Sequence, residues 1–357
     1  MRSVARAWTQ VIGGALSDLR AASAGRWREN AERDSLSVLA LLLIFTMVLS
    51  LFVGRFPQPY WMSPGQLQEN DLARQLVFSL RLPRILTAVM LGMTLAGAGA
   101  VMQMMFRNPL VEPGFLGVSQ GAGFGAALAI IKISNSPLVM ETCAAVFAFL
   151  GLVLSYFFAR HVRYGGWVLR LVLAGIVVSA LFSSGLGLLK YVADPLKQLP
   201  EITFWLLGGL WSVTWTDVLY IVPVVVPALT AIWLMRWRVN LLSLSDETAF
   251  SLGVSANRER GLLLGVSVAA TAAVVSVAGI VGWIGLIVPH IARRVTSTDA
   301  MHSLPAAMLM GGIFALLCDD IARTLYVGEI PLGILTSLIG AILFMLIMMS
   351  NPQRSRQ

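Results

Sequence analysis

The sequence carries little charge, few histidines and almost no cysteine. Only 12% of its 357 residues are charged, about half of the roughly 25% that is usual in soluble domains. Cys143 and Cys318 both fall in apolar segments, and His161, His290 and His302 lie far apart without ligand-like neighbours. The composition therefore argues against a soluble domain, a disulfide framework and a metal site.

Motifs for catalysis and nucleotide binding are also missing. The chain has no HExxH and no visible carboxylate pair or Ser-His-Asp set, which argues against a membrane enzyme. It has no GxxxxGK[ST] loop, so it cannot use ATP by itself in the usual way. The stretch GAGFGA (121–126) fits a loose dinucleotide pattern but lacks the strand that should precede it. A methionine cluster between 90 and 105 is more typical of packing than of a soft-metal path.

Long apolar runs are present from one end of the chain to the other. The mean hydropathy is +0.79, and a bilayer span needs roughly 20 apolar residues. The sequence therefore predicts an all-α polytopic membrane protein with about ten spans, which lie near 37–54, 85–106, 114–132, 137–160, 166–189, 217–235, 261–281, 283–293, 303–323 and 331–350. The run 283–293 is too short to cross alone. A further apolar piece, 202–211, reads as a partly inserted or surface helix.

The basic residues predict the orientation of these spans. An even number of spans puts both termini on one side, and 18 of the 26 Lys and Arg residues then share that side, against 8 on the other. The positive-inside rule makes it the cytoplasmic side. Because the arginines are scattered over many loops, the net charge of +8 does not indicate nucleic acid binding.

We expect three regions in the chain. Residues 1–34 form a basic cytoplasmic arm without a signal peptide, either a helix on the membrane surface or a disordered tail. Residues 35–350 form a single membrane domain, and 351–357 form a cytoplasmic tail.

Two polar interruptions on the cytoplasmic side stand out. In RNPLVEPGFLGVSQGAGFGA (107–126), prolines break the chain, and Gly117, Gly121 and Gly125 recur every fourth residue, a spacing that lets another helix approach closely. In 243–261, Ser245 can cap a helix that Gly253 ends, and Ser255 can start a second short helix. Such a pair is either a knob for a partner or an ordinary solvated loop.

Several long motifs together resemble one transporter family. They are RLPR (81–84), RNPLVEPGFLGVSQGAGFGA (107–126), ADPLKQLPEITFWLLGGL (193–210), SLGV (251–254), GWIGLIVPHIARR (282–294), DDIAR (319–323) and EIPLGILTSLIGA (329–341). The chain resembles a FecCD-type (BtuC-like) permease subunit of the ABC importers for iron-siderophores, haem, vitamin B12 and related chelates.

The resemblance implies a transporter of several subunits in the inner membrane of a bacterium. The permease would form a dimer, with a second copy or a sister subunit. Two cytoplasmic ATPase subunits would bind ATP and Mg, and a periplasmic or lipoprotein binding protein would deliver the cargo. Iron-siderophore is the cargo that it implies first, with haem, cobalamin and molybdate carried by similar permeases.

The resemblance also implies where the ATPase contacts the chain. It places the coupling helices at 243–260, where Ala249, Phe250 and Leu252 would insert into the ATPase and Gly253 would set the turn. The expected coupling set is Asp246, Glu247, Ala249, Phe250, Leu252, Gly253 and Arg258.

Two further sites are expected on the cargo's route. Gly175, Ser179 and Ser183 recur at four-residue spacing and form a small, mildly polar helix face, which is either the pathway or a packing face. The resemblance places this helix along the pathway.

Arg81, Arg84 and Arg323 are the expected docking residues for the binding protein, or else anchors at lipid headgroups. Pro83 favours an extended backbone at Leu82 and a helix start after it.

A secondary transporter is the main rival function. It would need ionisable groups inside the membrane, and the main candidates, Asp319 and Asp320, lie near the outer end of a span. Asp319 is also four residues before Arg323, on the same helix face, which predicts a pair between them.

Overall fold

The computed structural model describes residues 34–55, 60–134 and 136–349, and this part of the chain is almost entirely helical. The expected basic arm and the C-terminal tail lie outside the described residues. Eight helices within the described residues are long and apolar enough to cross a membrane: Asp34–Phe52, Asp71–Phe106 (α3, η1 and α4), α6 Pro137–His161, α7 Trp167–Val192, α9 Trp215–Leu234, α12 Ala256–Ala278, α14 Ala300–Leu325 and α15 Leu332–Met349.

Two shorter helices, of which the first is apolar, occupy the remaining predicted spans. They are Val118–Ile133, which consists of α5 (Val118–Leu128) and the π-helical turn η3 (Ala129–Ile133), and α13 (Ile284–Val295). The polytopic all-α prediction is therefore confirmed. The apolar piece 202–211 was predicted to be a short helix; the helix there, α8 (Gln198–Leu207), begins earlier and ends at Leu207, so 208–211 lie beyond it.

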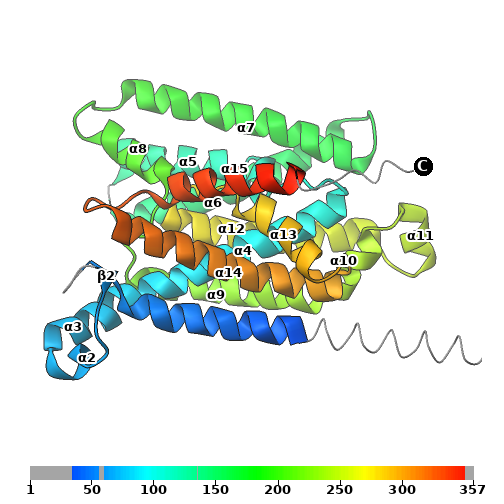
Figure 1. The fold of residues 1–357 in the computed structure, drawn as a ribbon. Helices are drawn as coiled ribbons and strands as arrows, with labels where there is room; N and C mark the ends of the chain where they lie inside the picture. The colour runs from blue at the N-terminus through cyan, green and yellow to red at the C-terminus, as the bar shows by residue number, and fades with distance from the viewer. Residues whose placement is uncertain (1–33, 56–59, 135, 350–357) are drawn as a thin grey trace, which may run out of the picture.

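The helices lie side by side around α4, which spans Leu82–Phe106 (Figure 1). Helix α14 makes the most extensive contact with α4, and α12, α13 and α9 also pack on it. Helix α7 lies at the margin of the bundle, and much of its surface is exposed. The core of the molecule therefore lies around α4.

The two ends of the bundle differ. One end, here the α11 end, carries α10 (Arg236–Leu242) and α11 (Asp246–Ser251), on the right of Figure 1. The opposite end, here the α8 end, carries the hairpin of β1 (Val53–Gly54) and β2 (Tyr60–Trp61), α2 (Gln66–Glu69) and α8.

Glycines allow the helices to pack closely. A Cβ at Gly92 in α4 would overlap the carbonyl oxygen of Gly311 in α14. Gly121 and Gly125 face α6 in the same way, against the backbone carbonyls of Phe147 and Cys143. The helix face predicted from the glycine spacing is thus a packing face between α5 and α6.

The chain enters α4 in a way that differs from the prediction. Leu82 is helical (φ −62°, ψ −48°) rather than extended, and one helix runs from α3 (Asp71–Leu76) through the π-helical turn η1 (Val77–Arg81) into α4. Pro83 lies in the first turn of α4, directly after this wider turn. The N–H that proline lacks is therefore missing at the point where the backbone hydrogen bonds change from the π-helical to the α-helical pattern.

Candidate functional site

Helix α11 projects from one end of the bundle as a short, capped element (Figure 1). The side chain of Ser245 accepts a hydrogen bond from the backbone N–H of Thr248 at 3.2 Å, as predicted for a helix cap. Gly253 has φ +77°, the left-handed conformation that ends the turn. Phe250 and Leu252 are 81% and 56% exposed, so α11 presents two large apolar side chains to a partner.

Two expectations for this loop are wrong. Ala249 is fully buried and packs into the chain's own core, so it is not available for insertion into another subunit. Ser255 does not begin a second short helix, because the residues after it are the first turn of the long helix α12. Glu247 and Arg258 are exposed on either side of the turn, and Asp246 is the first residue of α11.

A hydrogen bond joins this loop to the other cytoplasmic interruption in the sequence. The guanidinium of Arg107, which has left-handed φ at the end of α4, donates to the carbonyl of Leu244. The segment before α11 is thereby tied to the end of the most buried helix.

Three arginines at the α8 end form a largely buried polar network. Arg84 donates to Asp319 at 2.9–3.0 Å and to Glu329 at 3.0 Å. The side chains of Arg84 and Asp319 are 11% and 1% exposed. Glu329, with 33% of its side chain exposed and φ +53°, is the open side of the network.

The other two arginines connect η1 and α14 to the helix Asp34–Phe52. Arg81 donates to the carbonyl of Leu51 at 2.6 Å, and Arg323 donates to the carbonyl of Ser50 at 2.7 Å. Arg323 also pairs with Asp320. The predicted pair between Asp319 and Arg323 is therefore wrong. Asp319 pairs with Arg84 on α4, and Asp320 pairs with Arg323.

All three arginines were expected to face outward, yet they are mostly turned into the fold. Arg81 and Arg323 are 6% and 7% exposed, and Arg84 is held by two carboxylates. Their contacts within the chain join helices that are far apart in sequence.

The predicted pathway residues separate into three environments. Gly175 is buried against the backbone of Leu116. A Cβ added at Gly175 would lie 3.3 Å from the Cα of Leu116. Ser179 lines a cavity of about 390 Å³ between α4, α7 and α12, and Ser183 is exposed farther along α7.

A carboxylate missed in the sequence reaches the same cavity. Glu112 lines it and accepts a hydrogen bond from the backbone N–H of Trp283, which has φ +72°. Burial raises the pKa of the Glu112 carboxyl above its ordinary value, and this hydrogen bond opposes the rise. The polar residue at position 112, inside a motif singled out in the sequence, was the available signal.

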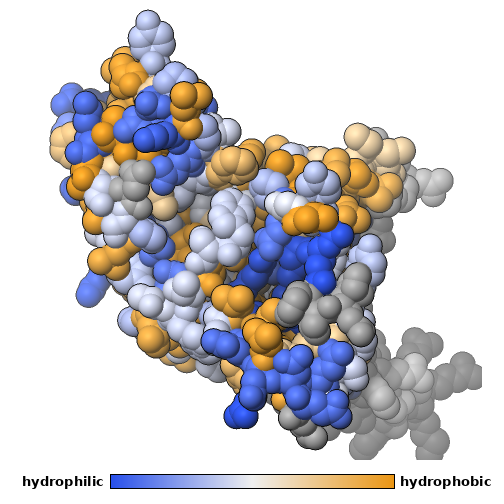
Figure 2. Space-filling view, turned by 90° about the vertical axis from the view of Figure 1, so that its left-hand side faces the viewer, coloured by the Kyte–Doolittle hydropathy of each residue, from blue (hydrophilic) through white to orange (hydrophobic). Residues whose placement is uncertain are grey.

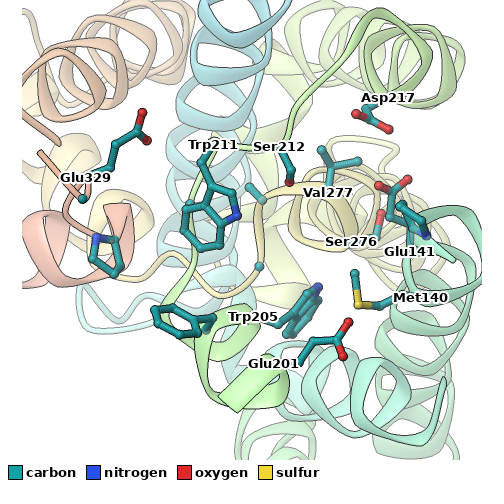
Figure 3. A pocket seen from close by; sticks show the side chains of 17 residues that line it. Met140, Glu141, Glu201, Trp205, Trp211, Ser212, Asp217, Ser276, Val277 and Glu329 are labelled. Carbon is teal, nitrogen blue, oxygen red and sulfur yellow. The ribbon is translucent and has the colours of Figure 1, made fainter. Parts of the chain in front are cut away.

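A larger cavity of about 570 Å³ opens at the α8 end. Figure 3 shows Glu329 on one side of it, Glu141 and Asp217 on the opposite side, and Trp205 and Trp211 between them. Glu201 on α8 adds a fourth carboxylate. The carboxylates come from α6, α8, α9 and the 326–331 loop, so no local sequence pattern connects them.

Part of this acidic lining serves the fold. Asp217 accepts hydrogen bonds from the backbone N–H and hydroxyl of Thr214 at 2.7 and 2.9 Å in the capping box of α9, and Glu329 is paired with Arg84. Within the described residues, no group of three or more His, Cys, Asp or Glu could hold a metal ion. Viewed from this end, hydrophilic residues form patches with apolar residues between them (Figure 2).

Comparisons with known proteins agree with this architecture. The family described as "FecCD transport family" matches residues 42–350. The molybdate import system permease protein MolB of Haemophilus influenzae is 39% identical over 314 residues, which are 86% of this chain and 92% of the relative. A Helicobacter pylori protein named "Probable iron chelatin transport system permease protein" is 40% identical over 272 residues, covering 76% of this chain and 81% of the relative.

A solved structure is similar over nearly the same range. It is an ABC transporter described as of metal-chelate type, in an inward-facing conformation, and it superimposes with a TM-score of 0.83 at 38% sequence identity. The match covers 89% of this chain and all of the other. With a family match over most of its length and relatives of about 40% identity, the chain belongs to the FecCD transport family and is a multi-pass permease of an ABC importer.

Proposed function

We propose that the chain carries an iron chelate, with iron-siderophore as the first candidate, across the cytoplasmic membrane of a bacterium. It would work beside a second permease subunit, either a second copy or a sister subunit. Two ATPase subunits that bind ATP and Mg would supply energy, and a periplasmic or lipoprotein binding protein would supply cargo. The chain itself has no phosphate-binding loop for ATP.

The observation that carries this proposal is α11. It is a capped helix at one end of the bundle with two large apolar side chains exposed, Phe250 and Leu252. Exposed apolar side chains on a rigid element are typical of a docking surface. We assign this surface to the ATPase, so the α11 end is cytoplasmic, as the distribution of basic residues predicts.

The α8 end is then external and would receive the binding protein. Of the three arginines expected to dock it, Arg84 is the one that we propose, through the open side of its network at Glu329, whereas Arg81 and Arg323 are 6% and 7% exposed and hold the fold beside it. Glu329 holds Arg84 and is one-third exposed, so a carboxylate of the binding protein can exchange with it. Ser179, at the mid-bundle cavity, is the residue of the predicted pathway face best placed to meet cargo.

The cargo is supported by the name of the Helicobacter relative, and molybdate is the second candidate because the Haemophilus relative is similarly close. Haem and cobalamin remain further alternatives. The test is the ATPase activity of the reconstituted transporter, with its binding protein loaded in turn with ferric siderophore, haem, cobalamin or molybdate. We expect the loaded ferric siderophore to stimulate hydrolysis most, and stimulation by molybdate alone would overturn the assignment.

A further inference from the structure

A basic cavity at the α11 end has no place in the transport mechanism described above. Its volume is about 630 Å³, and it lies between the end of α6, the start of α7 and the first turn of α12. Tyr156, Arg160, Trp167, Arg170 and Asn257 line it, and none of the described residues that line it is a carboxylate. The lining therefore combines positive charge with aromatic surface.

Arg160 and Arg170 make few polar interactions within the described part of the chain. Arg160 lies 5.9 Å from the ring centre of Tyr156, and Arg170 donates to the carbonyl of Val162 at 3.4 Å. The Nε of Arg170 is buried without a hydrogen-bond partner. Within the described part of the chain no carboxylate pairs with either arginine, whereas nearby Arg238 pairs with Glu259 at 2.6 Å. Both guanidinium groups are thus available to an anion.

The surroundings of the cavity reinforce its preference for an anion. Arg260 is buried beneath it, with its guanidinium 5.4 Å from the ring centre of Trp167. Helix α7 begins at Trp167, and its N-cap, Gly166, offers no side chain to the first backbone N–H groups. Free N–H groups and the helix dipole at such an end add to the pull of the arginines on a phosphate.

Apolar side chains continue from the cavity along the same helices. Phe157 on α6 is 54% exposed, and Leu169 and Leu173 on α7 are 43% and 41% exposed. Because Arg160 lies in the last turn of α6 and Trp167 begins α7, the cavity lies at the depth of lipid headgroups when these helices span the bilayer. A molecule with a phosphate and two hydrocarbon chains matches both parts.

We propose that this cavity binds an anionic phospholipid, with Arg160 and Arg170 holding the headgroup phosphate and the acyl chains lying along Phe157 and Leu173. Arginine suits this role because its planar fork of N–H donors fits phosphate oxygens. Basic pockets between membrane helices favour anionic over zwitterionic lipids, since the net charge of the headgroup adds to the attraction. A soluble phosphate shares the headgroup chemistry but lacks the chains.

The test uses the purified full chain in neutral detergent. Native mass spectrometry measures binding of phosphatidylglycerol to the wild type, to the Arg160→Gln/Arg170→Gln double variant and to an Arg163→Gln/Arg236→Gln control. The control removes the same charge from two arginines at the same end that lie outside the cavity lining, Arg163, which is exposed, and Arg236, which is half-buried beside Trp233. Phosphatidylcholine, inorganic phosphate and glycerol 3-phosphate serve as parallel ligands.

We expect the wild type and the control to bind phosphatidylglycerol alike, and the double variant to bind it about twenty-five-fold more weakly, at about fivefold for each arginine. Phosphatidylcholine should bind more weakly than phosphatidylglycerol to the wild type. An Arg160→Lys/Arg170→Lys variant should recover part of the affinity, which shows that the glutamine variant lost charge rather than its fold.

Three results would overturn the proposal. The first is equal affinity of the double variant and the control for phosphatidylglycerol. The second is equal occupancy by glycerol 3-phosphate or inorganic phosphate at the same concentration, which would assign the cavity to a soluble anion. The third is release of the lipid when the ATPase subunits are added, which would make the cavity a contact between subunits.

Discussion

At the scale of single residues, Arg84 at the α8 end has two roles, one in folding and one in docking, and they make different demands on its side chain. Arg84 is joined to Asp319 and Glu329, and only Glu329 is appreciably exposed. Removing one partner of a buried pair leaves the other charge without compensation. The same residue is therefore important for folding and, under the proposed function, for docking.

The Arg84→Ala variant should be strongly destabilised. It leaves the carboxylate of Asp319, 1% exposed, without its partner, and such a change costs about 3–5 kcal/mol. Thermal unfolding of the purified permease in detergent measures this, with Arg74→Ala on the exposed surface of α3 as the control. Equal unfolding temperatures for the two variants would contradict the structural role of the pair.

Glu329→Gln separates docking from folding more cleanly. It weakens the pair at the exposed side of the network while Asp319 still holds Arg84, so the guanidinium becomes easier to reach. If a carboxylate of the binding protein exchanges with Glu329, affinity for that protein should rise about fivefold, because an exposed pair is worth up to about 1 kcal/mol. Surface plasmon resonance at low salt tests this, and unchanged or lower affinity would place docking elsewhere.

Local sequence patterns predicted some of these residues well and others poorly. The cap at Ser245 and the turn at Gly253 depend on neighbours within a few positions, and both are confirmed. The partner of Asp319 is Arg84, 235 positions away. Nothing local distinguishes that pair from the wrongly predicted pair with Arg323, because only the packing of α4 on α14 decides it.

At the scale of elements, glycine spacing predicted a contact that the structure confirms between α5 and α6. Gly121→Val should disrupt it, because the new side chain would overlap the carbonyl of Phe147. Overpacking of this kind costs about 1–3 kcal/mol. The control is Gly265→Val in α12, where a Cβ meets nothing within 4 Å. Similar losses of thermal stability in both variants would mean that helix propensity, not packing, is responsible.

Helix α11 offers a test that separates coupling from folding. Phe250→Asp alters an 81% exposed side chain, so the permease should fold normally but lose most of its ATP-driven uptake. Phe250→Leu keeps an apolar side chain and should retain most of it. Ala249→Asp, at a fully buried position, should instead reduce the folded yield. Normal coupling in Phe250→Asp would remove α11 from the ATPase contact.

Hydropathy predicted the helices better than it predicted their ends. The predicted spans correspond to helices because burial in lipid demands long apolar runs. Pro83 was expected to start a helix, but the chain passes it within a continuous helix from Asp71 to Phe106. The turn after Gly253 leads into α12 rather than into a separate helix. Such boundaries depend on neighbouring helices as much as on the residues themselves.

At the scale of the whole molecule, the two ends of the bundle have distinct chemistry. The α11 end presents Phe250 and Leu252 beside exposed arginines, while the α8 end presents carboxylates and tryptophans around a cavity. The family was recognisable from long motifs in the sequence. The acidic cavity was not, since four separate elements build it. This asymmetry suits a permease with different partners on its two sides.

Under the proposed function, the chain is the membrane path of an ATP-driven importer. The most direct measurement reconstitutes it in proteoliposomes with its ATPase, adds binding protein loaded with radiolabelled ferric siderophore outside, and traps nucleotide inside. We expect iron to accumulate with ATP and not with ADP, and Phe250→Asp to abolish the difference. Equal uptake with ATP and ADP, or uptake driven by a proton gradient alone, would contradict it.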